Sequence, residues 1–133
     1  YSDTKASAQT AYTYTVKAYD ASNNLSAASN VASVTTPTQP FSVLSSSASG
    51  ATATTVTVKS TTSEASTIVI KYGTSQSNLT LSATDTVPAT THTVSLSGLT
   101  RKTKYYYQIV ATSTDGTNKQ ASSTVQMFST KPR

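Results

Sequence analysis

The chain has 133 residues, enough for one ordinary domain or for a domain and part of another. Serine and threonine supply 51 residues, only 11% of residues are charged, and there is one histidine and no cysteine. Disulfides, cysteine–zinc sites and cysteine nucleophiles are therefore excluded. Threonine and tyrosine favour strands, whereas serine competes with helical hydrogen bonds, so the composition predicts a β protein. No apolar run approaches the length of a membrane-spanning helix, which needs about 18 residues.

The formal net charge of +5 comes from ten basic residues that are spread thinly along the chain. The densest basic group is Arg101, Lys102 and Lys104. A nucleic-acid surface needs a concentrated basic patch with exposed aromatic side chains, and no stretch combines the two. Nucleic acid is therefore not expected as a partner.

Two strands are predicted in the first part of the chain. Apolar and polar side chains alternate in residues 11–18, which gives that strand one apolar face. A turn-rich stretch follows, and residues 30–36 form the second strand. The two prolines of residues 37–40 cannot join a sheet ladder, so this stretch is expected to be a linker.

The pattern then restarts with several short strands separated by turns, which is typical of a β-sandwich. The strands are predicted at residues 54–59, 68–72, 78–82, 92–96, 104–112 and 124–130. Alternation predicts that the inward-facing residues are Val56, Val58, Ile68, Ile70, Tyr72, Leu79, Leu81, Val94, Leu96, Leu99, Tyr105, Tyr107, Ile109 and Phe128.

An internal repeat divides the chain into modules. Residues 10–18 and 103–111 both read Thr-x-Tyr-x-Tyr-x-(Val/Ile)-x-Ala, at an offset of 93 residues, which is about one sandwich module. We therefore expect residues 1–36 to be the C-terminal strands of a first module. Residues 37–40 are the linker, 41–130 a complete second module and 131–133 a tail, and the whole chain is expected to be part of a longer one.

The motif around the second copy of the repeat resembles the fibronectin type III family. The chain reads Leu99-x-x-x-Thr103-x-Tyr105-x-Tyr107-x-Ile109, close to the recurrent corner of that family. The resemblance implies an all-β, immunoglobulin-like β-sandwich. It also implies a structural tyrosine corner at Tyr105, with Leu99 and Thr103 beside it and Tyr12 as the counterpart in the first module. The tryptophan usual in the family is missing, and Val58 stands in its apparent position.

No catalytic, metal or cofactor site is predicted. His92 is the only histidine, and its nearest acidic neighbour in sequence is Asp85, so a strand-end histidine half covered by neighbours is expected rather than a catalytic base. Asp115 beside Gly116 has too few oxygen ligands near it for calcium, and a tight turn is expected there.

Tyr106 is the candidate for a carbohydrate contact. Alternation places it on the outer face between the inward-facing Tyr105 and Tyr107. A single exposed tyrosine is a poor platform for stacking on sugar rings. A carbohydrate-binding module that takes polysaccharide as its partner is therefore the weaker alternative function.

The resemblance is to the bacterial version of the family, which occurs in secreted polysaccharide-degrading enzymes and cell-surface proteins. The leading hypothesis is a non-catalytic spacer in a secreted, multi-modular bacterial carbohydrate-active enzyme of the glycoside hydrolase type. Its partners are the neighbouring modules of the longer chain. Its expected location is extracellular, with attachment to the cell surface as a further option.

The second hypothesis is a structural subunit of an adhesin or extracellular filament. Thirty-six residues cannot bury an independent core, so the apolar face of residues 1–36 needs a cover. The cover is either a missing segment of the same natural chain, packing onto the second module, or strands exchanged with other copies of the chain. Strand exchange would build a polymer. A missing segment is the preferred explanation.

Overall fold

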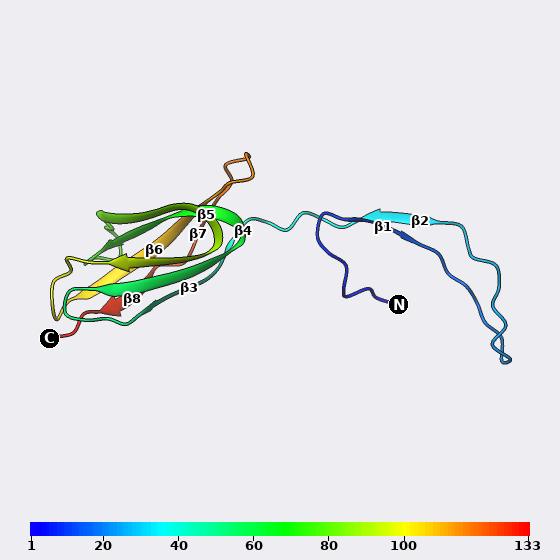
Figure 1. The fold of residues 1–133 in the computed structure, drawn as a ribbon, viewed down its shortest axis with the longest axis horizontal. Coiled ribbons are helices and arrows are strands. Elements are labelled where there is room, and N and C mark those ends of the chain that lie inside the picture. Colours follow the sequence, from blue (N-terminus) through cyan, green and yellow to red (C-terminus); the bar gives the residue numbers. More distant parts are fainter. The chain divides into compact units, whose positions relative to one another are not determined.

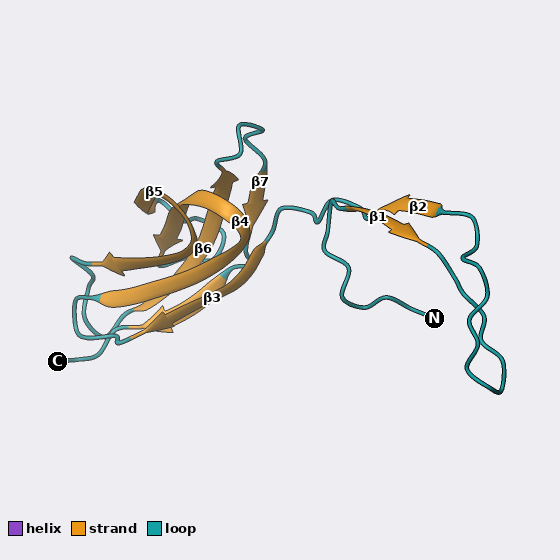
Figure 2. Cartoon of the chain, turned by 45° about the vertical axis from the view of Figure 1, so that its right-hand side comes forward, coloured by secondary structure: helices purple, strands orange, loops and turns teal.

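The computed structural model describes residues 1–133 and divides them into two compact units, Tyr1–Gln39 and Pro40–Arg133. Both units contain strands and no helix, which confirms the all-β prediction (Figure 2). The structure has no helix long and apolar enough to cross a membrane.

The first unit is a two-stranded antiparallel sheet of β1 (Ala11–Tyr14) and β2 (Ala32–Thr35). β1 is shorter than the predicted strand because two serine side chains interrupt the ladder after it. The backbone N–H groups of Val16 and Ala18 donate to the hydroxyl oxygens of Ser29 and Ser26, both at 3.0 Å. These side chains take the place of the backbone acceptors that a regular ladder would supply.

The second unit is a two-layer sandwich built around two long strands that bend (Figure 1). The first half of β4 pairs with β3 and with the second half of β5. The second half of β4 pairs with the first half of β5 and with β6, which also pairs with β7 and β8. The strands are β3 (Val43–Ser49), β4 (Val56–Gly73), β5 (Leu81–Leu96), β6 (Lys104–Ser113), β7 (Gln120–Ser122) and β8 (Gln126–Ser129).

The strands differ from the prediction at several places. β3 and β7 lie outside the predicted strands, and the strand predicted at 78–82 begins only at Leu81, as the start of β5. The strands predicted at 54–59 and 68–72 are the two halves of β4, and the register shift between Thr61 and Ser66 marks the bend between them. The stretch 92–96 is the second half of β5. A strand that bends can serve both layers, and its ladder is interrupted only where the register shifts.

The core lies between the two layers and agrees with most of the predicted inward set. Its buried members are Val56, Val58, Ile68, Ile70, Leu96, Leu99, Tyr105, Tyr107, Ile109, Ala111 and Phe128. Tyr72, Leu79 and Val94 are only partly buried. The prediction for Leu81 is wrong, because its side chain is 47% exposed. Leu81 is the first residue of an edge strand that pairs with β4 alone, so only one neighbouring strand covers it.

Candidate functional site

The predicted corner residue, Tyr105, lies in the core of the second unit and is bonded to the connection that precedes β6. The residue is 4% exposed, and its hydroxyl oxygen accepts a hydrogen bond of 3.0 Å from the backbone N–H of Thr100. Its ring stacks on Phe128 at a centroid distance of 5.5 Å. Leu99 is buried next to this loop. The side chain thus fixes the loop between β5 and β6 to the core.

A second set of hydrogen bonds joins the same loop to the end of β8. The Thr130 hydroxyl accepts from the backbone N–H of Thr103 at 2.9 Å and donates to the carbonyl of Thr100 at 2.6 Å. The Thr103 hydroxyl donates to the carbonyl of Arg101 at 2.9 Å. Sequence analysis did not assign this role to Thr130. Thr36, directly before the first proline, stands at the matching place in the first module and could have indicated the role.

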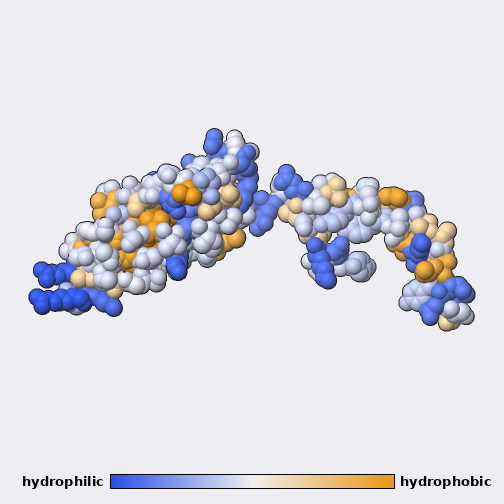
Figure 3. Space-filling view, in the orientation of Figure 1, coloured by the Kyte–Doolittle hydropathy of each residue, from blue (hydrophilic) through white to orange (hydrophobic).

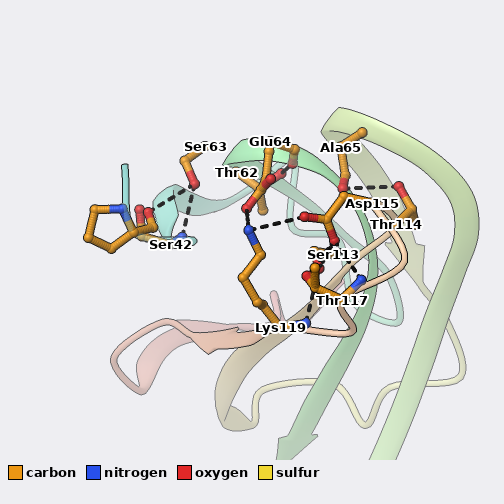
Figure 4. Close-up of polar contacts among 11 residues, drawn as sticks. Ser42, Thr62, Ser63, Glu64, Ala65, Ser113, Thr114, Asp115, Thr117 and Lys119 are labelled. Carbon is orange, nitrogen blue, oxygen red and sulfur yellow. Dashed lines mark hydrogen bonds and ion pairs between the residues drawn. The ribbon is translucent and has the colours of Figure 1, made fainter. Parts of the chain in front are cut away.

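The chain is bonded to the sandwich where it leaves and where it enters. At the exit, the N–H of Lys131 donates to the carbonyl of Thr52 at 2.8 Å, so the predicted tail is attached at its first residue. At the entry, Ser42 and Ser63 exchange two hydrogen bonds of 3.0 Å through backbone and side-chain groups. The Ser63 hydroxyl also donates to the carbonyl of Pro40 at 3.4 Å (Figure 4). The backbone therefore enters and leaves the second unit in fixed directions.

Near the entry, Lys119 binds two carboxylates, as Figure 4 shows. Its ammonium nitrogen lies 2.6 Å from Glu64 and 3.2 Å from Asp115, and the hydrogen bond to Glu64, followed by the one to Asp115, raises the lysine pKa. Hydrogen bonds from Thr117, and then from Ser113, hold the pKa of Asp115 far below its usual range. All three charged side chains are about one third or more exposed, so these ion pairs add little stability.

This cluster does not offer a calcium site. The Asp115 carboxylate is occupied by the ammonium of Lys119 and by the hydroxyls of Thr117 and Ser113. No group of three or more histidine, cysteine, aspartate or glutamate side chains in the structure is placed to hold a metal ion. The cluster joins the bend of β4 to the loop after β6.

The expectation for His92 is wrong, because the residue is 1% exposed and lies well inside β5 rather than at a strand end. The bend of β5 brings Asp85 back over the ring, with its Oδ2 at 3.0 Å from Nδ1. The other ring nitrogen lies 3.0 Å from the carbonyl of Ala89. The two contacts hold the ring in one orientation inside the bend. The hydrogen bond from His92, followed by one from the N–H of Val87, lowers the pKa of Asp85.

Ser66, His92 and Asp85 lie in the spatial order of a hydrolytic triad, but a substrate cannot reach them. The Ser66 hydroxyl lies 3.4 Å from Nε2, yet Ser66 is fully buried and Nε2 already faces the carbonyl of Ala89. A nucleophile must reach the carbon atom that it attacks, and the Ser66 hydroxyl is buried too deeply for a substrate to reach it. The three residues instead satisfy one another's polar groups inside the bend, and Ser66 is the member that sequence analysis did not place there.

Tyr106, the carbohydrate candidate, lies on the outer face of β6. Its cross-strand neighbours are Gly73 in β4 and Met127 in β8. The tyrosine is half-buried rather than freely exposed, whereas Met127 is 63% exposed. A side chain at Gly73 would force the backbone to shift, because a Cβ there would lie 2.7 Å from the carbonyl oxygen of Asn78. A single, partly covered aromatic ring provides little area for stacking on a sugar.

Comparison with known families gives one match over most of the second unit. Residues 42–130 match the family described as purple acid phosphatase, N-terminal domain. The match is to the domain that precedes the rest of those enzymes.

Two bacterial enzymes are similar in sequence. Chitinase A1 of Niallia circulans is 35% identical over 127 residues, covering 90% of this chain and 18% of the enzyme. Exoglucanase B of Cellulomonas fimi is 34% identical over 141 residues, covering 98% of this chain and 12% of the enzyme. The chain thus spans less than a fifth of the length of either relative.

Two solved structures share the fold. The FN1–FN3 domains of chicken CNTN1 superpose with a TM-score of 0.53 at 14% identity, covering 98% of this chain and 44% of that one. Domains d3–d4 of the rat CD45 extracellular region give a TM-score of 0.53 at 12% identity, covering 98% and 68%. They confirm the predicted immunoglobulin-like sandwich.

Proposed function

Since the chain belongs to the purple acid phosphatase N-terminal domain family and is a bacterial fibronectin type III-like domain, we propose that it is a non-catalytic spacer in a secreted, multi-modular glycoside hydrolase. Its partners in this role are the modules on either side, and its location is extracellular. The role is to hold those modules at a set distance and orientation.

The similarity to two enzymes with different names supports a role that is independent of substrate. One relative is a chitinase and the other an exoglucanase, and the chain resembles a small part of each. A module that is similar in both enzymes is suited to a task that both enzymes share. Spacing is such a task, whereas recognition of one polysaccharide is not.

The observation that carries the proposal is the attachment of both ends of the second unit. Pro40 and Ser42 are bonded to Ser63 at the bend of β4, and Lys131 is bonded to Thr52 just beyond the other end of β3. Figure 1 shows the chain entering this unit at one pole and ending at the opposite pole. Because the backbone is held at both poles, the sandwich transmits direction as well as distance, which a flexible linker cannot do.

The length of the spacer follows from its strands. β6 has 10 residues and runs along the sandwich, which corresponds to about 33 Å. A flexible Gly/Ser chain with the same number of residues as the second unit would have a root-mean-square span of about 50 Å and a broad distribution of distances. The two cases are therefore distinguishable by a distance measurement.

The test uses fluorescent dyes on cysteines introduced by Gln39→Cys and Arg133→Cys, which flank the second unit in a chain without natural cysteine. Single-molecule energy transfer should give one narrow distance distribution that broadens only when urea unfolds the sandwich. A Gly/Ser-rich chain of equal length with the same two dyes is the control. A native distribution as broad as that control would refute the spacer role.

Two assays separate the spacer from its alternatives. The chain should release no sugar from insoluble chitin, cellulose or xylan, and measurable hydrolysis would contradict a non-catalytic role. In pull-downs on the same three polysaccharides, the chain should stay in solution as serum albumin does. Binding that is lost in Tyr106→Ala would favour a carbohydrate-binding module instead.

A further inference from the structure

We propose that residues 1–39 are the last hairpin of another fibronectin type III-like module. The exposed apolar face of this hairpin binds a set of strands equivalent to β3, β4 and β5. The partner is therefore a polypeptide with the fold of residues 41–99. The proposal does not depend on the spacer role. It depends on a bond-by-bond repetition inside the chain.

The tyrosine corner is present twice. In the second unit, the hydroxyl oxygen of Tyr105 accepts from the N–H of Thr100 at 3.0 Å. In the first unit, the hydroxyl oxygen of Tyr12 accepts from the N–H of Ser7 at 2.8 Å. Each acceptor follows its donor by five residues, and the two pairs are separated by the 93-residue offset of the sequence repeat.

The threonine that fastens the end of the hairpin is also repeated. The Thr130 hydroxyl accepts from the N–H of Thr103, and the Thr36 hydroxyl accepts from the N–H of Thr10, both at 2.9 Å. The N–H of Thr130 returns a bond to the carbonyl of Thr103, and the N–H of Thr36 returns one to the carbonyl of Thr10, both at 3.0 Å. These contacts join segments that are 26 or 27 residues apart, so local sequence alone does not produce them.

The loop before each hairpin has the same unusual backbone. Gln9 and Lys102 both adopt left-handed conformations, with φ of 52° and 53°. The N–H of Gln9 donates to the carbonyl of Pro37, and the N–H of Lys102 donates to that of Lys131, both at 3.1 Å. A left-handed non-glycine residue is uncommon, so its recurrence at the matching position is specific.

A serine replaces a ladder acceptor at the same place in both hairpins. Ser29 accepts from the N–H of Val16 and returns its own N–H to the carbonyl of Val16. Ser123 makes the same two bonds with Ile109. The first unit thus repeats these backbone and side-chain contacts of the β6–β8 hairpin.

What differs is the cover over the apolar face. In the second unit the apolar side chains of the hairpin are sealed by β3, β4 and β5, and Ile109 is fully buried. The matching Val16 is 71% exposed, and Val34, which matches the buried Phe128, is 52% exposed. Figure 3 shows apolar residues at the surface of the first unit. The first unit also has a hollow of about 680 Å³, lined by Tyr1, Asp3, Tyr14, Thr15, Val16 and Lys17.

The chain itself shows which cover fits. The matching face in the second unit is covered by residues 41–99, so a segment of that fold has the shape and polarity that the first hairpin requires. A second copy of this chain gains no free energy by supplying this cover, because its own residues 41–99 already cover β6–β8. Lending them would expose as much apolar surface as it covered.

The test is a fusion chain in which residues 40–99 precede residues 7–133, so that Leu99 is followed by Ser7 as it is naturally followed by Thr100. In the fusion, amide protons of Thr13 and Thr15 should exchange with solvent at least 100-fold more slowly than in the parent chain. Circular dichroism should report about twice the unfolding amplitude of the parent. The matched control carries Ile68→Asp and Ile70→Asp in the added segment only, and it should show no slowing.

Three results would overturn the proposal. The first is equal exchange at Thr13 and Thr15 in the fusion and in the parent. The second is slow exchange of these amides in a monomeric parent chain, because the face would then need no partner. The third is a parent that sediments as a dimer or polymer with the same amides protected, which would make the face a self-association surface and revive strand exchange between copies.

Discussion

Replacing Tyr105 with phenylalanine isolates the hydroxyl of the tyrosine corner. The ring and its stacking on Phe128 remain, and only the bond from the N–H of Thr100 is lost. Thr100 is exposed, so water can reach its N–H after the substitution. The cost is then the net value of one neutral hydrogen bond, about 1 kcal/mol, without the larger penalty of a buried unpaired donor.

For a unit of this size, about 1 kcal/mol corresponds to a decrease in Tm of roughly 4–8 °C. Urea unfolding followed by circular dichroism should show a lower midpoint with an unchanged slope, because the surface exposed on unfolding stays the same. Tyr106→Phe is the control on the same strand, since the hydroxyl of Tyr106 makes no protein hydrogen bond in the structure.

The same substitution in the first unit completes the test. Tyr12→Phe removes the matching bond from Ser7, but from a hairpin without a covering sheet. It should leave the unfolding of the second unit unchanged. A Tyr105→Phe variant that unfolds within error of the parent, or a Tyr12→Phe variant that destabilises the chain equally, would show that the corner does not act through the core.

Three further predictions concern the second unit. The hydrogen bond from His92 lowers the folded-state pKa of Asp85, so the carboxylate stabilises the fold at pH values above its unfolded-state pKa of about 4. This contribution is lost as the pH falls through the folded-state pKa. Asp85→Asn should therefore flatten the pH dependence of the unfolding free energy below a pH of about 4, measured by urea unfolding at a series of pH values. Gly73→Ala should destabilise by roughly 1–3 kcal/mol in thermal unfolding, since its Cβ meets the Asn78 carbonyl oxygen, and unchanged stability would contradict that packing. Ile109→Ala should cost about 2–5 kcal/mol by the same assay, and a cost below 1 kcal/mol would mean that the site is not closed.

Alternation along the chain was sufficient to predict most of the strands and most of the core, but not β3, β7 or the middle of β5. The two faces of β6 follow from Tyr105, Tyr107 and Ile109, because a strand places every second side chain on the same side. The resemblance to the fibronectin type III corner motif pointed to Tyr105, and the internal repeat extended that prediction to Tyr12. These features depend on neighbours within a few residues, which a single sequence displays directly.

Contacts across the sandwich were decided by the tertiary structure. Glu64 and Lys119 are 55 positions apart and meet only because the bend of β4 and the loop after β6 reach the same pole. The bend of β5 brings Asp85 to His92 and buries a histidine that looked half covered, while the edge position of the same strand exposes Leu81. Alternation determines which way a side chain points, but not where a strand bends or whether another strand lies over it, because those depend on how the layers close around the shared core.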